Sequence, residues 1–99
     1  MRPSDPEHDA VVRELRERIT AADRALLAAV NDRLALVREL RAHKLERGWD
    51  FVDRDREGQL VDALARENPG PLSESGLREL FADVLALSKR EVAGGDDPR

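Results

Sequence analysis

The sequence predicts an all-α fold with three helices per chain, one long and two shorter, that pairs into an intertwined homodimer. Apolar residues recur at three- and four-residue steps in three separate segments, which is the spacing of amphipathic helices. The breaks between the segments, RGWD and NPGP, are typical of helix ends. No alternating strand pattern and no internal repeat is found in the 99 residues.

The first helix is predicted from about Ala10 to about Glu46, with no proline or glycine in between. Its apolar residues form a narrow stripe of the coiled-coil kind. The stripe consists of Val12, Leu15, Ile19, Ala22, Leu26, Val30, Val37 and Leu40. Gly48, in the break that follows, is a suitable helix-terminating residue.

The second helix is predicted to start between Asp53 and Asp55 and to run to about Glu67, where NPGP stops it. Early acidic residues favour this start through the helix dipole. The apolar positions of the second helix are Leu60, Val61 and Leu64.

The third helix is predicted to begin after Ser73 as its N-cap and to run to about Val92. Its stripe consists of Leu77, Leu80, Phe81, Val84 and Leu85. The helical domain is therefore expected to comprise residues 10–92. Residues 1–9 are expected to be a flexible lead-in and residues 93–99 a disordered tail.

The length of the first helix predicts the dimer. A helix of about 35 residues is roughly 50 Å long, whereas a compact domain of about 100 residues has a radius of gyration of only about 13 Å. The two later helices are together shorter than the first and cannot cover its whole stripe. A second copy of the chain is expected to cover the rest, through antiparallel or crossing pairs of the long helix. The less favoured alternative is an elongated monomeric coiled-coil hairpin.

Composition limits the class of function. The net charge of −4 opposes a nucleic-acid role, because such a role usually needs a clustered basic face. The chain has no cysteine, which excludes disulfides and thiolate metal sites and suits a reducing cytosol. No signal peptide and no apolar run long enough to cross a bilayer is recognised, so a cytoplasmic location without membrane contact is expected.

Two permanent cations lie on the apolar stripe of the first helix. At about 100° per residue, with Arg33 as the origin, Leu26 and Lys44 both lie at about 20°. One such residue is usually explained by a stem that packs on the core while the charged head reaches water. Two on one stripe favour an anionic partner, because each must otherwise be solvated to offset the cost of desolvation.

The second helix places further charges beside its apolar positions. Arg56 lies one turn before Leu60 and Glu57 one turn before Val61, so both are expected to border the buried face. The alternative is helix-start electrostatics, in which an aspartate caps the helix and Arg56 pairs with a neighbour.

Ser88 and Arg16 each allow two interpretations. Ser88 continues the stripe of the third helix, so its hydroxyl should point inward, either to a ligand or to the carbonyl four residues earlier. Arg16 lies about 25 Å from Arg33 along the same helix, so it could join Arg33 only if the second subunit supplied it. Otherwise Arg16 is a solvated surface charge.

Several cations around a largely aliphatic pocket suit a small polyanion with an apolar body. No nucleophile–base pair, metal-ligand cluster or glycine-rich phosphate loop is seen in the sequence. His8 lies in the lead-in and His43 lies about 80° off the stripe, so neither suits a general base. An enzyme with this site would position its substrate and stabilise charge, with no cofactor.

Three stretches of the sequence, taken together and in this order, resemble a known family: LRERITAADRALLAAVNDRLALVRELRAHK, VDRDRE and NPGPLSESGLRELF. The first is similar to the signature LR..I...D..LL.L...R......I...K of the all-helical, type II chorismate mutases, and the second resembles their V.D..RE motif. The resemblance runs from about Leu15 to Val92. It implies a homodimeric isomerase of the shikimate pathway that converts the dicarboxylate chorismate to prephenate, for phenylalanine and tyrosine biosynthesis.

The resemblance implies a role for each matching residue of the first helix. Arg16, lent across the dimer, and Arg33, from the same subunit, would bind the substrate carboxylates. Lys44 would hydrogen-bond the ether oxygen and contact a carboxylate. Together with Glu57 of the second helix, Arg33 and Lys44 would form the catalytic set.

The remaining roles fall on the later helices. Asp53 would contact the substrate hydroxyl through its backbone and Glu57 through its carboxylate. Arg56 would be another cation of the pocket, and Ser88 a polar contact near a carboxylate.

One position departs from the family pattern. Four residues after the serine, the family usually has a glutamine or glutamate that donates a second hydrogen bond to the ether oxygen, whereas this chain has Val92. Either Glu91 serves instead or the donor is missing, which could make the protein slow or dependent on an activating partner.

Three alternatives stay open beside the mutase. A sister enzyme on the same scaffold could act as an isochorismate pyruvate lyase or an aminodeoxychorismate mutase. A weakly active regulatory subunit could dock on another shikimate-pathway enzyme. A purely structural helical dimer would give no reason for cations on inward faces.

Overall fold

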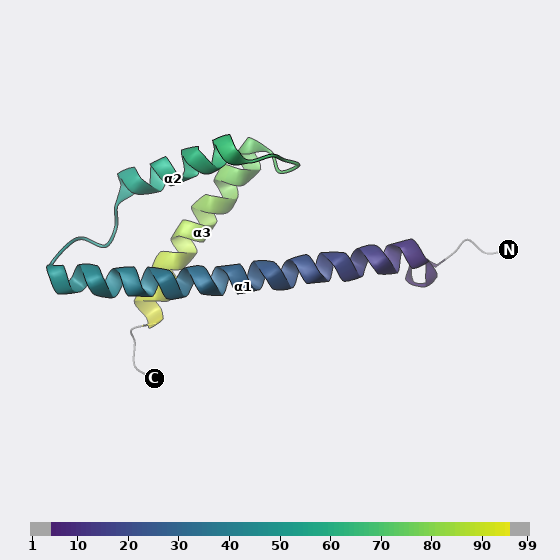
Figure 1. The fold of residues 1–99 in the computed structure, drawn as a ribbon, viewed down its shortest axis with the longest axis horizontal. Coiled ribbons are helices and arrows are strands. Elements are labelled where there is room, and N and C mark those ends of the chain that lie inside the picture. The colour runs from purple at the N-terminus through teal and green to yellow at the C-terminus, as the bar shows by residue number, and fades with distance from the viewer. Residues whose placement is uncertain (1–4, 96–99) are drawn as a thin grey trace. The chain divides into compact units, whose positions relative to one another are not determined.

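The computed structural model describes the backbone of residues 5–95 and the side chains of residues 5–93. Between residues 5 and 95 the chain forms a short 3-10 turn, η1 (Pro6–His8), and three α-helices, α1 (Ala10–Arg47), α2 (Arg54–Glu67) and α3 (Glu74–Gly95), with no strand (Figure 1). The predicted all-α class, with one long helix and two shorter ones, is confirmed. The chain divides into two compact units, Met1–Arg33 and Leu34–Arg99. In the described part of the chain, no helix is both long and apolar enough to span a membrane.

The start of α1 is determined by Asp9. Its Oδ1 accepts a hydrogen bond from the backbone N–H of Val12 at 3.0 Å, which satisfies one of the free donors at the helix N-terminus. Asp5 caps η1 in a similar way. The helix therefore begins where the sequence predicts, and residues 5–9 of the predicted lead-in form this capped turn. Residues 1–4 lie outside the described part of the chain.

The apolar stripe of α1 is exposed in the first unit. Leu15, Ile19 and Leu26 expose 47%, 60% and 59% of their surface, and none of the 38 residues of α1 is buried. Adjacent apolar residues are exposed as well, namely Val11 and Leu27. Such a continuous apolar surface is uncommon on monomers and marks a site of interaction.

The end of α1 is a Schellman motif centred on Gly48. Gly48 has a φ of +72°, in the left-handed region that glycine adopts without steric cost. Its N–H bonds to the carbonyl of Leu45 at 3.2 Å, and the N–H of Trp49 bonds to the carbonyl of Lys44 at 2.9 Å. The predicted role of Gly48 as the helix-terminating residue is confirmed.

The N-terminus of α2 is capped by Asp53. Its backbone is extended, with φ −128° and ψ 94°, and its Oδ1 accepts a hydrogen bond from the N–H of Arg56 at 3.0 Å. The helix ends at Glu67, and its C-cap Asn68 stands directly before a proline. Asn68 also closes the turn that follows, because its Nδ2 donates to the carbonyl of Leu72 at 2.8 Å.

Ser73 is the N-cap of α3, as predicted, since its Oγ accepts a hydrogen bond from the N–H of Gly76 at 3.0 Å. The helix continues to Gly95, three residues past the predicted end at Val92. The helix thus extends past the predicted start of the tail at residue 93, and residues 96–99 lie outside the described part. Glycine ends a helix where it takes the left-handed conformation, as Gly48 does, and not merely by its presence in the sequence.

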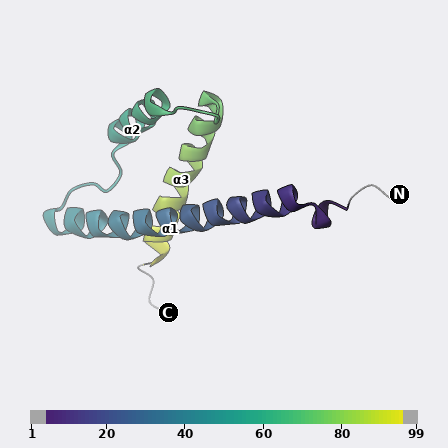
Figure 2. The ribbon, with the colours of Figure 1, turned by 45° about the vertical axis from the view of Figure 1, so that its right-hand side comes forward.

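Helices α2 and α3 pack on each other as a helical hairpin (Figures 1 and 2). Leu77 is buried, with 4% of its surface exposed. Next to it, Arg78 Nη1 lies 3.0 Å from Asp62 Oδ1 on α2, and Arg78 Nε lies 3.1 Å from Glu74 Oε2. The hydrogen bond with Asp62, followed by that with Glu74, raises the pKa of the Arg78 guanidinium above its ordinary value. The two carboxylates therefore favour the charged form of Arg78.

Candidate active site

The first unit carries two of the eight predicted site residues. Arg16 is exposed and Arg33 is half-buried. They are about 25 Å apart along α1, which is too far for both to bind one small molecule from the same helix. In a single chain, Arg16 is therefore a surface charge and Arg33 a half-buried one.

Lys44 is half-buried in the second unit. Its Nζ donates a hydrogen bond to the carbonyl of Phe51 at 3.1 Å, across the loop that follows α1. An ammonium group has three donors, so two N–H groups stay available for a ligand. The contact also reduces the rotamer freedom that Lys44 would lose on binding.

Asp53 and Arg56 form the first turn of α2. The side chain of Asp53 is used as the helix cap, which leaves its main chain as the part that could meet a ligand. Arg56 is exposed, so the prediction that it borders the buried face is wrong for a single chain. The whole first turn of α2, residues 54–56, is exposed, because no other part of this unit covers it.

Glu57 is half-buried and is paired with a residue that the sequence reasoning missed. Lys89 Nζ, on α3, lies 3.0 Å from Glu57 Oε1 and 2.9 Å from Oε2. The Lys89 side chain exposes 38% of its surface and the Glu57 side chain exposes 25%. One signal in the sequence could have found the lysine, since Lys89 lies four residues after Leu85 and seven after Ala82, on one face of α3.

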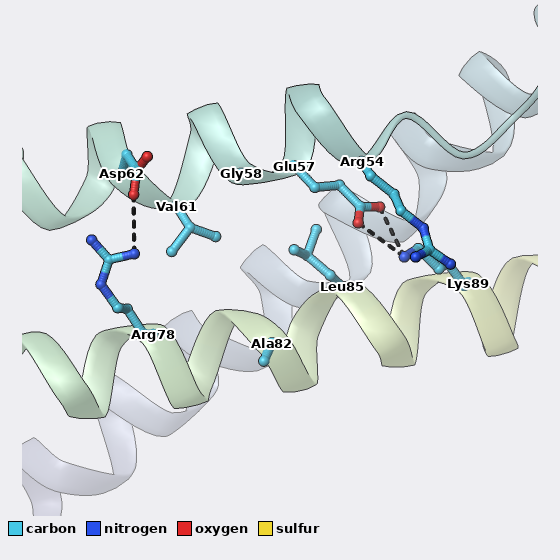
Figure 3. Close-up of a pocket in the computed structure, with 9 residues that line it drawn as sticks. All are labelled: Arg54, Glu57, Gly58, Val61, Asp62, Arg78, Ala82, Leu85 and Lys89. Carbon is cyan, nitrogen blue, oxygen red and sulfur yellow. Dashed lines mark hydrogen bonds and ion pairs between the residues drawn. The ribbon is translucent and has the colours of Figure 1, made fainter.

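The groove between α2 and α3 has a volume of about 530 Å³, within the range of small-molecule sites. Figure 3 shows two ion pairs at its ends, Glu57 with Lys89 and Asp62 with Arg78, on either side of an apolar stretch. That stretch is lined by Gly58, Val61, Ala82 and Leu85. Of the eight predicted site residues, Glu57 is the one that lines this groove.

Ser88 and Val92 are the buried members of the predicted set. Ser88 exposes 5% of its surface, and its Oγ donates to the carbonyl of Val84 at 2.7 Å. This is the predicted bond to the carbonyl four residues earlier. Val92, one turn later, exposes 1%. Glu91, the other candidate for the family's second donor, is exposed.

The second unit thus holds three kinds of group on α1, α2 and α3: an ammonium fixed to a carbonyl, a carboxylate fixed to a lysine, and a buried hydroxyl beside a buried valine. Each of these groups can donate to or accept from a polar ligand. Among the described residues, no group of three or more His, Asp or Glu side chains could hold a metal ion.

Known proteins that are similar to this chain point in the same direction. The family model of chorismate mutase type II matches residues 15–92, a segment that contains all eight predicted site residues. Form I of the chorismate mutase from Thermus thermophilus is 30% identical, with a TM-score of 0.76, and the match covers 78% of this chain and 96% of that chain. Form II of the same enzyme is 28% identical, with a TM-score of 0.81 and coverage of 87% and 98%. No curated protein matches the chain.

Proposed function

The chain belongs to the chorismate mutase type II family, and from that membership we propose that it rearranges chorismate to prephenate as a cytoplasmic enzyme of aromatic amino acid biosynthesis, without a cofactor. The observation that carries the proposal is the family match across residues 15–92 together with the half-burial of Arg33 and Lys44 inside it. A purely structural helical dimer would not require the half-buried Lys44 ammonium, which has two N–H groups available for a ligand.

The reaction is an intramolecular Claisen rearrangement. The ether C–O bond of chorismate breaks while a C–C bond forms, and negative charge grows on the ether oxygen in the transition state. Lys44 is proposed to donate to that oxygen, an interaction that strengthens as the charge develops and therefore raises the rate. Its bond to the Phe51 carbonyl supports this role because it holds the ammonium in place before the substrate arrives.

Arginines are proposed to hold the two carboxylates. Arg33 would bind one of them from the same subunit and Arg16 the other from the partner, with Arg56 as a further cation. Two parallel hydrogen bonds from a guanidinium fix the orientation of a carboxylate. Holding the enolpyruvyl side chain over the ring reduces the entropic part of the barrier.

The polar residues of α2 and α3 complete the proposed site. Asp53 would meet the substrate hydroxyl through its main chain, since its carboxylate caps α2. Glu57 would accept a hydrogen bond from the same hydroxyl, and Ser88 would lie near a carboxylate. Val92 would add an apolar wall where the family usually has a donor.

A homodimer is part of the proposal. The exposed stripe of α1 needs a cover of matching length, and a second α1 provides it. The distance between Arg16 and Arg33 supports the same arrangement, because the two residues could meet only across two copies.

A second candidate is a weakly active subunit that depends on another shikimate-pathway enzyme. The observation that favours it is the burial of the apolar Val92, at 1% exposure, in the place of the family's second donor. Loss of such a donor costs about 2.7–4 kcal/mol of transition-state stabilisation in other enzymes.

The test is a side-by-side assay of purified protein against chorismate, isochorismate and aminodeoxychorismate. Loss of chorismate absorbance with formation of prephenate is expected. Release of pyruvate from isochorismate, or turnover of aminodeoxychorismate alone, would identify a sister enzyme instead. An unchanged chorismate signal at high protein concentration would count against the mutase.

A further inference from the structure

The ion pair between Glu57 and Lys89 joins a residue of the proposed site to one with no role in it. Lys89 Nζ lies almost equally far from both carboxylate oxygens, at 3.0 and 2.9 Å. A contact to both oxygens fixes the rotation of the carboxylate as well as its position. Figure 3 shows the lysine reaching from α3 toward the carboxylate across the end of the groove.

The pair leaves Glu57 able to bind a substrate. An ionised carboxylate has about four acceptor positions, and one ammonium that bridges its two oxygens occupies two of them. The remaining positions can accept a hydroxyl proton. Glu57 exposes 25% of its side chain, so a ligand can still reach it.

Another cation lines the same end of the groove (Figure 3). Arg54 lies three residues before Glu57 on α2, is exposed, and extends toward the same end of the groove in Figure 3. Lys89 approaches from the opposite helix and holds Glu57 against α3.

We propose that Lys89 is a positioning residue, which orients the Glu57 carboxylate to accept the hydrogen bond of the substrate hydroxyl. The inference rests on the proposed function, because it assigns Lys89 a task in the same site. The hydroxyl contact exists in both the bound substrate and the transition state, so its loss weakens binding of the two equally. Lys89 therefore acts on KM and not on kcat.

The experiment compares three variants in the chorismate assay. Lys89→Met is expected to raise KM about tenfold and to leave kcat within about twofold of the wild type. The tenfold factor corresponds to the rotamer freedom that the Glu57 side chain regains without the lysine. Lys89→Arg keeps two parallel donors and is expected to restore most of the affinity. Arg78→Met breaks the other ion pair between α2 and α3 and is expected to leave KM unchanged.

A double-mutant cycle separates positioning from general stabilisation. In a Glu57→Gln background, Lys89→Met is expected to cause no further rise in KM, since the orientation of a carboxylate no longer matters. An unchanged KM in Lys89→Met, or an equal rise in Arg78→Met, would overturn the inference and leave the mutase standing. A wild-type protein without activity on chorismate would overturn the proposed function and the inference together.

Discussion

Replacing Val92 by glutamine tests the most unusual position of the site. Val92 is the most deeply buried side chain described, with 1% of its surface exposed, and it lies one turn after the buried Ser88. In the family that this chain belongs to, the same position usually donates a second hydrogen bond to the ether oxygen. Val92→Gln is therefore expected to lower stability in the free protein and to raise the rate of the reaction.

Both magnitudes follow from the burial of Val92. Overpacking a filled site costs about 1–3 kcal/mol, and a buried amide without a partner costs about 1–3 kcal/mol more. The free energy of unfolding is then expected to fall by about 2–6 kcal/mol. If position 92 lies beside the ether oxygen, the amide is expected to donate to that oxygen in the transition state. Such a donor is worth up to about 2.7–4 kcal/mol, or a rise in kcat of about a hundredfold or more.

The matched control is Val92→Met, which has a side chain of similar length without a donor. Its loss of stability should be limited to the overpacking of about 1–3 kcal/mol, and its kcat should not rise. Urea unfolding at a fixed protein concentration gives the stability, and the chorismate assay at a temperature where each variant is folded gives kcat. Equal kcat in the glutamine and methionine variants would refute the assignment of position 92 to the ether oxygen. A glutamine variant as stable as the wild type would contradict the burial.

Three further predictions concern activity and stability. Lys44→Ala should lower kcat about 10²–10³-fold while it costs at most about 3 kcal/mol of folding free energy, and full activity would remove Lys44 from the mechanism. Mixing Arg16→Ala with Arg33→Ala subunits should restore about a quarter of the sites at equal concentrations, because each mixed dimer has one intact site; no recovery after confirmed exchange would exclude the shared site. Ser73→Ala should lower the free energy of unfolding by about 1 kcal/mol in urea titrations, whereas Ser75→Ala should change it less, and equal losses would speak against the cap.

The helix ends could be predicted from the sequence because they depend on local chemistry. Gly48, Asp53 and Ser73 each act on backbone groups within a few residues, so their roles follow from order in the chain alone. The end of α3 at Gly95 was not predicted, because a glycine can continue a helix as well as end it.

The candidate site was harder to predict. Periodicity gives the direction of a side chain around its own helix, but not whether another element covers that direction. Arg56 has the right direction and is nonetheless exposed, because the first turn of α2 is uncovered. For Lys89, the spacing from Leu85 indicates the direction of the side chain but not its partner, because Glu57 lies 32 residues away.

The two bonds of Lys44 have a consequence for the length of the loop between α1 and α2. Its carbonyl accepts from Trp49 and its ammonium donates to Phe51, so one residue is tied by both its main chain and its side chain to the segment that leads to Asp53. Surface loops commonly tolerate added or deleted residues. Here one inserted residue would break one of the two hydrogen bonds of Lys44 or shift the N-cap of α2. Natural and engineered variants should therefore keep the spacing of nine positions from Lys44 to Asp53, even where the residues between them differ.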